Sequence, residues 1–409
     1  MKTIHQILLL LFVVFFGFVG AAMPYPIFAP LFFHPVHGGL IPVQWSLSIR
    51  SICLGITLAA YPFGQFIGSP ILGSLSDQFG RKILLSTSLL GVGLCYALSG
   101  LAIGHRMLWL LILSRLLTGF LEGNLAIAQA SMADLTTDKH KWFGALSAMA
   151  SIGYVVGPLL GGILSNQHII SWFSLSLPFY VASVIAILTM VCVMLWTNET
   201  LIKKNTSKKT LIYQFNVFTR FKKLSSHLKN LIICGFFLSL AIDAYYEFFP
   251  VFLVGRWQMT TTEIAWFTSI LSIALAVGSF KIPSILNKNY SSYFALLTMI
   301  ALLPITLLLM LLTYNKNFIY FEFIIIGLSY GAANTLHSVL VSNKAEMNQQ
   351  GEVMGIRWGL RMLGDAMNCI FGGLLIAISI NLPIIAAIIF SVLSFILFYK
   401  RRDNTDLTL

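Results

Sequence analysis

The stretch GYVVGPLLGG, residues 153–162, places four glycines and one proline inside a segment that is otherwise apolar enough to cross a membrane. Glycine destabilises a helix interior by about 1 kcal/mol, and proline by about 3 kcal/mol, relative to alanine. Gly153, Gly157 and Gly161 are four residues apart, so they form one smooth stripe against which another helix can pack closely. Pro158 removes the backbone hydrogen bond to residue 154 and permits a bend. The stretch therefore predicts a tightly packed, bendable transmembrane helix.

The composition of the whole chain is that of an integral membrane protein. Of its 409 residues, 57% are hydrophobic and 10% are charged, whereas a soluble domain carries about 25% charged residues. We predict an all-α fold with twelve transmembrane helices, because twelve apolar segments are long enough to cross about 30 Å of hydrocarbon. The first could instead be a cleaved secretory signal, but an internal repeat favours its retention. The segments are residues 7–33, 47–72, 83–103, 108–131, 142–164, 174–196, 230–254, 264–286, 291–313, 318–342, 354–379 and 381–399.

The net charge of +12 follows the loops and indicates orientation rather than nucleic-acid binding. Most lysines and arginines fall in alternate loops, including both ends of the chain, and such residues stay in the cytoplasm. We therefore expect a multi-pass protein of a bacterial inner membrane with both termini in the cytoplasm. The five cysteines lie within predicted spans as small apolar residues. No disulfide framework, metal or cofactor is expected from their spacing.

The chain reads as two halves with the same plan. Residues 1–196 and 230–409 each carry six predicted spans, and the polar, basic segment 197–229 is the predicted cytoplasmic linker. Several small residues recur in the same order in the two halves, which indicates a duplicated six-helix unit. Such repeats are typical of secondary transporters. The recurring pairs are Gly144 and Gly355, Gly153 and Gly364, Gly161 and Gly372, Gly162 and Gly373, Gly119 and Gly327, Gly123 and Gly331, and Pro30 and Pro250.

The turn after the second span, GSLSDQFGRK at residues 73–82, carries a complete G-x-L-x-D-x-x-G-R-K pattern. It resembles the signature loop of the major facilitator superfamily. The resemblance implies that Asp77 sits near a helix end of the other half and that Arg81 pairs with nearby acids, so that the loop latches the cytoplasmic side. The second half keeps Gly278 and Lys288 without the acid. The predicted cytoplasmic gate consists of Gly73, Asp77, Gly80, Arg81 and Lys82.

The fifth predicted span resembles a second motif, that of the twelve-span drug:proton antiporters in the same superfamily. The motif is a glycine, eight residues, a second glycine, three residues, Gly-Pro, two residues and Gly-Gly, and the fifth span satisfies every position. The resemblance implies an exporter, while packing glycines alone are the other interpretation. The matching residues are Gly144, Gly153, Gly157, Pro158, Gly161 and Gly162.

Ionisable residues deep in the spans are the candidate proton-coupling groups, because a charge at the bilayer centre is expensive. Arg115 and Glu122 lie in the fourth span, and the resemblance implies a proton-coupling role for the arginine. Asp243 and Glu247 are four residues apart in the seventh span and therefore share one helix face. This pair is suited to taking and releasing a proton. The alternative interpretation of Arg115 is a buried arginine bonded to backbone carbonyls. The alternative interpretation of Asp243 and Glu247 is a structural salt bridge to an arginine.

The eleventh span supplies possible partners for these acids in Arg357, Arg361 and Asp365. Arg357 is close enough to the cytoplasm to extend toward it. Arg361 either neutralises Asp365 or holds a carboxylate or phosphate of the substrate. The predicted substrate-binding residues are Arg361, Asp365, Asn124, Asn334 and Tyr246.

The predicted function is proton-coupled secondary transport by alternating access, with export of a small organic molecule or drug. The alternatives are export of an anionic metabolite such as a carboxylate siderophore, and proton-driven uptake of a nutrient. No catalytic constellation or nucleotide-binding loop is visible, so an enzyme is not expected. The expected partners are a small-molecule substrate, protons and the lipid bilayer, and the protein is expected to function as a monomer.

Overall fold

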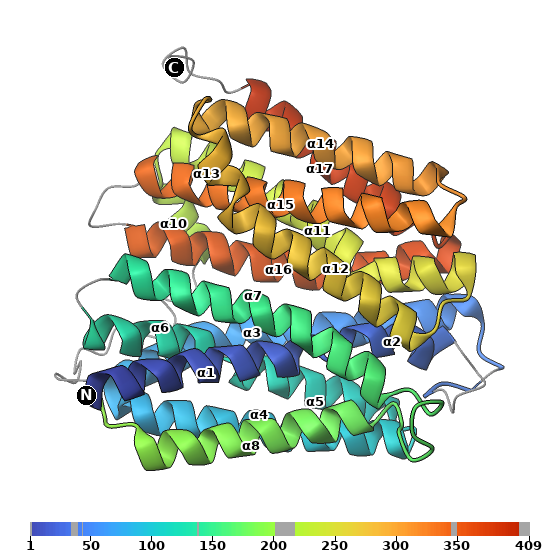
Figure 1. Cartoon of the computed structure of the whole chain (residues 1–409), viewed down its shortest axis with the longest axis horizontal. Coiled ribbons are helices and arrows are strands. Elements are labelled where there is room, and N and C mark those ends of the chain that lie inside the picture. The colour runs from blue at the N-terminus through green and yellow to red at the C-terminus, as the bar shows by residue number, and fades with distance from the viewer. Residues whose placement is uncertain are drawn as a thin grey trace. The chain divides into compact units, whose positions relative to one another are not determined.

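The computed structural model describes residues 2–33, 40–42, 44–136, 139–200, 217–344 and 350–400, and these form helices joined by short loops (Figure 1). The predicted all-α fold is confirmed. The helices are α1 (Lys2–Ala22), α2 (Tyr25–Phe33), α3 (Leu47–Phe79), α4 (Arg81–Gly104), α5 (Leu108–Leu121), α6 (Asn124–Leu135), α7 (Lys139–Leu164), α8 (Leu177–Trp196), α10 (Val217–Lys223), α11 (Ser226–Trp257), α12 (Thr261–Phe280), α13 (Ile282–Leu286), α14 (Ser292–Leu312), α15 (Lys316–Lys344), α16 (Gln350–Ile378) and α17 (Leu382–Lys400).

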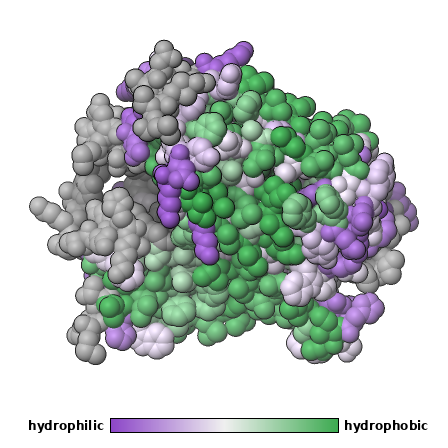
Figure 2. Space-filling view, turned by 45° about the horizontal axis from the view of Figure 1, so that its top comes forward, coloured by the Kyte–Doolittle hydropathy of each residue, from purple (hydrophilic) through white to green (hydrophobic). Residues whose placement is uncertain are grey.

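The spans agree with the twelve expected from the sequence. Within the described residues, ten helical segments are long and apolar enough to cross a membrane, and Leu108–Leu121 and Ala148–Leu164 are shorter apolar helices. Large apolar side chains such as Leu195 and Trp196 are 68% and 67% exposed. Much of the surface in Figure 2 is accordingly hydrophobic, as a lipid-facing surface must be.

Two compact units make up the chain. The first contains Met1–Phe215 with Met259–Ser269, and the second contains Asn216–Gln258 with Ile270–Leu409. In the first unit α1 packs on α7, α3 on α5, and α4 on α8; in the second, α11 packs on α16 and α17, and α14 on α15. The sequence-based halves, 1–196 and 230–409, are a prediction that these units do not test.

Three spans that we expected to be continuous are broken, and one of them, residues 264–286, divides into α12 and α13 at Lys281. The first span divides into α1 and α2 beside Pro24, which has no N–H to donate to the helix ladder. The fourth divides into α5 and α6 at Glu122 and Gly123. There the Glu122 N–H donates to the Gly119 carbonyl at 3.2 Å and the Gly123 N–H to the Leu121 carbonyl at 2.9 Å, both closing tighter turns than an α-helical bond does. The break leaves Glu122 at the end of α5 instead of within a regular helix.

Glycines let the backbones of α3 and α5 touch. A Cβ atom on Gly64 would lie 2.8 Å from the Phe120 nitrogen, and one on Gly119 would lie 2.9 Å from the Tyr61 carbonyl carbon. These distances are too short for any side chain, and the opposing atoms are backbone atoms that cannot rotate away. The crossing therefore fixes where Tyr61 stands relative to α5.

The second unit repeats this crossing between α12 and α15. A Cβ atom on Gly327 would lie 2.8 Å from the Leu271 carbonyl oxygen, and Gly278 faces the Leu328 backbone in the same way. Gly278 thus lies within a helix crossing like that of Gly64 and Gly119, whereas the sequence comparison placed it in a remnant of the loop at residues 73–82. The repeat that the glycines predicted holds for helix packing.

Candidate functional site

The break between α5 and α6 creates a buried carboxylate site at Glu122. This residue is 8% exposed, and the Tyr61 hydroxyl donates a 2.5 Å hydrogen bond to its Oε2 atom. Tyr61 comes from α3, 61 positions away in sequence. The carboxylate is therefore held by a neutral donor rather than by a hydrogen-bonded cation.

Arg115 lies on the same tyrosine. Its guanidinium carbon is 4.5 Å from the centre of the Tyr61 ring and 5.3 Å from that of Phe28. The side chain is 5% exposed, and its Nε and Nη1 atoms have no hydrogen-bond partner among the described residues. Aromatic faces stabilise a desolvated guanidinium by about 2 kcal/mol, but they leave its N–H groups unused. Tyr61 thus contacts both ionisable groups of the predicted proton-coupling site in this unit.

A small cavity adjoins Glu122. It is lined by Glu122, Tyr96, Gly20 and Thr189 together with apolar side chains of α1, α4 and α8. The buried Tyr96 hydroxyl has no hydrogen-bond partner within the described part of the chain, and the Tyr96 ring packs on Gly20. The Tyr96 hydroxyl and the Glu122 carboxylate therefore line the same small cavity.

Asp243 of the second unit forms an ion pair across two helices. Its Oδ1 atom on α11 lies 3.2 Å from an Nη atom of Arg361 on α16. Asp243 is 8% exposed, and its Oδ2 atom has no hydrogen-bond partner in the described set. The structure thus contains the salt bridge that was the alternative interpretation of Asp243. The other expectations for this arginine, neutralisation of Asp365 and contact with a substrate anion, stay predictions.

Glu247, Asp365 and Cys369 form a second polar cluster in this unit. One oxygen or sulfur atom from each lies within 4.8 Å of the others, and the Cys369 thiol is 3.8 Å from Asp365 Oδ1. These three could contact a cation, although the sequence gives no reason to expect a resident metal. Glu247 therefore lies close to Asp365.

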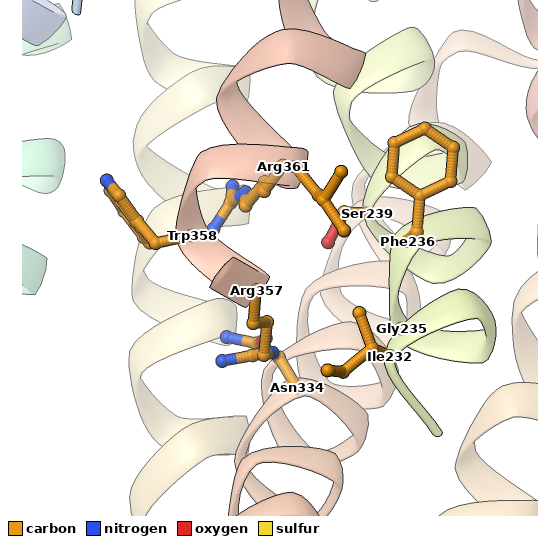
Figure 3. A pocket seen from close by; sticks show the side chains of 9 residues that line it. Ile232, Gly235, Phe236, Ser239, Asn334, Arg357, Trp358 and Arg361 are labelled. Carbon is orange, nitrogen blue, oxygen red and sulfur yellow. The ribbon is translucent and has the colours of Figure 1, made fainter. Parts of the chain in front are cut away.

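A cavity lies between α11, α15 and α16, and Figure 3 shows its lining. Arg357 donates a 2.6 Å hydrogen bond to the Asn334 side-chain oxygen, so it turns to α15 instead of extending toward the cytoplasm as expected. Arg361 and Trp358 lie along the same face of α16, with the guanidinium carbon 5.4 Å from the indole centre. Arg361 and Asn334, both predicted substrate-binding residues, therefore line one cavity.

Tyr246, another predicted substrate-binding residue, is not among the lining residues of this cavity. Tyr246 packs edge-on against Phe249, with ring centres 6.0 Å apart. The side chain of Asn124 lies outside the described residues.

The loop between α3 and α4 is held by two acids that the sequence did not single out. Gly80 adopts a left-handed φ of 110°, which favours glycine. The Glu199 carboxylate accepts hydrogen bonds from the backbone N–H groups of Arg81 at 2.8 Å and Lys82 at 3.2 Å, and so caps the first turn of α4. The Arg81 side chain pairs with Asp134 of α6 at 3.3 Å.

Two other members of the predicted gate, Gly73 and Asp77, have no described contact with these acids. Gly73 has open space around it, and the side chain of Asp77 is outside the described residues.

The glycine stripe of α7 meets the backbone of α1. Cβ atoms on Gly153 and Gly157 would lie 2.8 Å and 2.7 Å from the carbonyl oxygens of Phe15 and Val19. Gly161 continues the contact at the Met23 carbonyl, where α1 ends. The members of the motif beyond this stripe are Pro158, inside α7, Gly162, facing Ala265, and Gly144, whose surroundings are not described.

Broken helices, buried carboxylates and glycine-packed crossings define a class of protein, the secondary transporters of membranes. The chain belongs to the Major Facilitator Superfamily, whose family model matches residues 7–368. Its structural neighbours are transporters, not enzymes. Family members move small molecules across membranes, and the chain is a multi-pass membrane protein of this kind.

Several relatives of the chain are bacterial resistance proteins. It is 27% identical over 396 residues to the Multidrug resistance protein 2 of Bacillus subtilis (strain 168), covering 94% of this chain and 92% of the relative. It is 25% identical to the Tetracycline resistance protein, class C, of Escherichia coli, covering 87% and 85%. The class B protein of Escherichia coli is 38% identical over 158 residues, which span 38% of this chain and 36% of that protein.

Solved structures share the fold at low sequence identity. The human organic anion transporter MFSD10 (TETRAN) matches with a TM-score of 0.71 and 18% identity, covering 97% of this chain and 99% of the other. A D-xylose-proton symporter matches with a TM-score of 0.73 and 14% identity, covering 100% of this chain and 99% of the other.

Proposed function

We propose that the protein is a proton-coupled exporter of small organic molecules that works by alternating access in a bacterial inner membrane. Both termini are in the cytoplasm in this proposal, and one chain is the working unit. The printed names of the relatives, which refer to multidrug and tetracycline resistance, support export as the direction. The matching of the glycine stripe to the antiporter motif supports it as well.

The observation that carries the proposal is the environment of Glu122. A carboxylate taken out of water is tolerated when it is neutral, or when it is ionised beside a cation with its lone pairs bonded. Glu122 has a tyrosine hydroxyl as its hydrogen-bond donor, and Arg115 reaches the same tyrosine through its ring face. Burial therefore favours the neutral, protonated carboxyl group of Glu122, whereas the Tyr61 hydroxyl and the nearby Arg115 favour the ionised carboxylate.

Asp243 supplies a second proton site in the proposal. Its pair with Arg361 is made through one oxygen, and the other oxygen is buried without a partner among the described residues. A proton on Asp243 would weaken this bond between α11 and α16. In this proposal, protonation shifts the equilibrium between two conformations of the transporter. The size of the shift is the difference between the free energies with which the two conformations bind the proton.

The loop between α3 and α4 is the proposed cytoplasmic latch. Arg81 joins it to α6 through Asp134, and Glu199 joins the end of α8 to the start of α4. Contacts of this type contribute about 0–1 kcal/mol each when exposed. Together they can bias a balanced equilibrium without locking it.

Everted membrane vesicles test the function directly. Respiration acidifies their interior, so an antiporter should accumulate its substrate inside, and a protonophore should abolish the accumulation. Tetracycline and cationic dyes are the first compounds to test, given the names of the relatives. Proton-driven accumulation would support export, whereas gradient-driven accumulation only in right-side-out vesicles would show uptake.

The decisive variant is Glu122→Gln, and Glu322→Gln is its matched control. Glu322 is 1% exposed and accepts a 2.5 Å hydrogen bond from the Thr313 hydroxyl, so it is also a buried carboxylate held by a hydroxyl. We expect Glu122→Gln to lose gradient-driven accumulation and Glu322→Gln to keep it. Equal losses in both variants would mean that buried carboxylates matter for folding, not for proton coupling.

A further inference from the structure

The cavity between α11, α15 and α16 has an unusual charge for a space inside a membrane protein. Its described lining contains two arginines and two uncharged polar residues, and none of these lining residues is acidic. The space measures about 380 Å³ including its open mouth. It is lined by Ile232, Gly235, Phe236, Ser239, Asn334, Arg357, Trp358, Leu360 and Arg361.

The two arginines differ in how their charges are balanced. Arg361 pairs with Asp243, which is not among the lining residues. Arg357 donates to the side-chain oxygen of Asn334 at 2.6 Å, and no carboxylate among the described residues lies within ion-pair distance of it. The carboxylates of Asp365 and Glu247 belong to the cluster with Cys369, and neither residue lines the cavity. Within the described part of the chain, one positive charge at the cavity is therefore uncompensated.

The position of Arg357 makes this imbalance costly. The residue lies seven positions after the start of α16, about 10 Å along the helix. Turned toward α15, its guanidinium is held partly away from water. An arginine so placed is commonly paired with an anion or exposed to a water-filled space. A bound anion would supply the missing charge, and the planar guanidinium can hold a carboxylate through two parallel hydrogen bonds.

We propose that this cavity binds the anionic group of an organic acid, with Arg357 as the primary contact and Asn334 orienting its guanidinium. The apolar side chains decide what else the ligand carries. Phe236 and Trp358 lie at the cavity on different helices (Figure 3), so an aromatic or other flat apolar body fits best beside the charged group. The ligand class is a small aromatic monoanion.

This inference rests on the proposed function in one respect, since it names the class of substrate that the transporter would take. It also changes the role expected for Arg361 from the sequence. With Asp243 as its ion-pair partner, Arg361 is committed, and Arg357 becomes the group with charge to offer.

Equilibrium binding to the full-length protein in lipid nanodiscs tests the site without any proton gradient. The probes are 1-naphthoate and its uncharged isostere 1-naphthamide, titrated by calorimetry at constant pH. We expect naphthoate to bind at least about tenfold more tightly than the amide, because a hydrogen bond to a charged group contributes more than a neutral one. Equal affinities, or no naphthoate binding, would overturn the proposal.

Two variants and one control locate the binding. Arg357→Gln should weaken naphthoate binding about tenfold or more, and Arg357→Lys should recover part of it, because lysine keeps the charge without the planar fork. Arg256→Gln is the control, since Arg256 lies on α11 of the same unit, near aromatic rings, but bonds to the Leu311 carbonyl away from the cavity. A loss of binding in Arg256→Gln equal to that in Arg357→Gln would also contradict the site.

The binding result and the transport result can fail separately. Naphthoate binding that depends on Arg357, without proton-driven flux in vesicles, would retain the anion site and refute the exporter. Proton-driven flux of drugs with equal binding of naphthoate and naphthamide would retain the exporter and refute the anion site.

Discussion

The contact between α7 and α1 gives a stability prediction that can be worked from distances. In Gly157→Ala the new methyl carbon would lie 2.7 Å from the Val19 carbonyl oxygen and 2.9 Å from the Ala22 Cβ atom. Ordinary contacts begin at 3.4 Å, so α1 and α7 must shift by roughly 0.7 Å, the difference between 3.4 and 2.7 Å. Neither opposing atom is the end of a flexible side chain, and the shift must involve backbone.

The cost of such overpacking is about 1–3 kcal/mol. Alanine also favours a helix over glycine by about 1 kcal/mol, so the net effect of Gly157→Ala alone is smaller. Gly17→Ala separates the two terms, because Gly17 lies in α1 with nothing within 4 Å of its Cβ position. That variant gains helix propensity without a clash, and the difference between the two variants isolates the packing cost.

Thermal unfolding of the purified variants in one detergent measures the difference. At about 2–4 °C for each kcal/mol in a unit of this size, Gly157→Ala should melt about 2–12 °C below Gly17→Ala. If both variants melt together, α1 and α7 do not touch through this glycine, and the account of the motif as a packing stripe is wrong.

Three further predictions concern polar contacts. Tyr61→Phe should lower gradient-driven transport about tenfold or more, because it removes a hydrogen bond to a charged group. The control Tyr314→Phe, at an 86% exposed residue, should leave transport unchanged. Equal transport rates in the two variants would contradict the role of Tyr61. Gly80→Ala should destabilise the protein by about 1–2 kcal/mol, since its φ of 110° is unfavourable for alanine, and an unchanged melting temperature would refute this. Asp243→Asn and Arg361→Gln should each destabilise by about 3–5 kcal/mol and the double variant by less than their sum; additive losses in the melting experiment would show that the pair is not energetically coupled.

Helix packing was predictable because its signal is local. Glycines four residues apart in GYVVGPLLGG must share one face of a helix. Their partners have the same spacing: the carbonyls of Phe15 and Val19 on α1, and of Met23 directly after it. The partner helix was not predictable, since nothing in the spacing says which backbone will approach. The crossing of α3 and α5 had the same kind of signal at both partners, since Gly64 and Gly68, like Gly119 and Gly123, are four residues apart.

The charged pairs were less predictable because their partners are distant in sequence. Four-residue spacing pointed from Arg361 only to Asp365, whereas the structure also pairs Arg361 with Asp243, 118 positions away. Tyr61 carries no sequence signal for its bond to Glu122. The break at Glu122 was missed because apolar composition measures how well a segment suits lipid, not whether its backbone is regular.

Proton coupling at Glu122 is the central claim, and reconstituted proteoliposomes test it most directly. Substrate exchange at equal pH on both sides needs binding and alternating access, whereas accumulation against a gradient also needs proton exchange. In Glu122→Gln we expect exchange to continue near the wild-type rate while accumulation driven by a pH gradient is lost. Gradient-driven accumulation at the wild-type level in Glu122→Gln would contradict the claim.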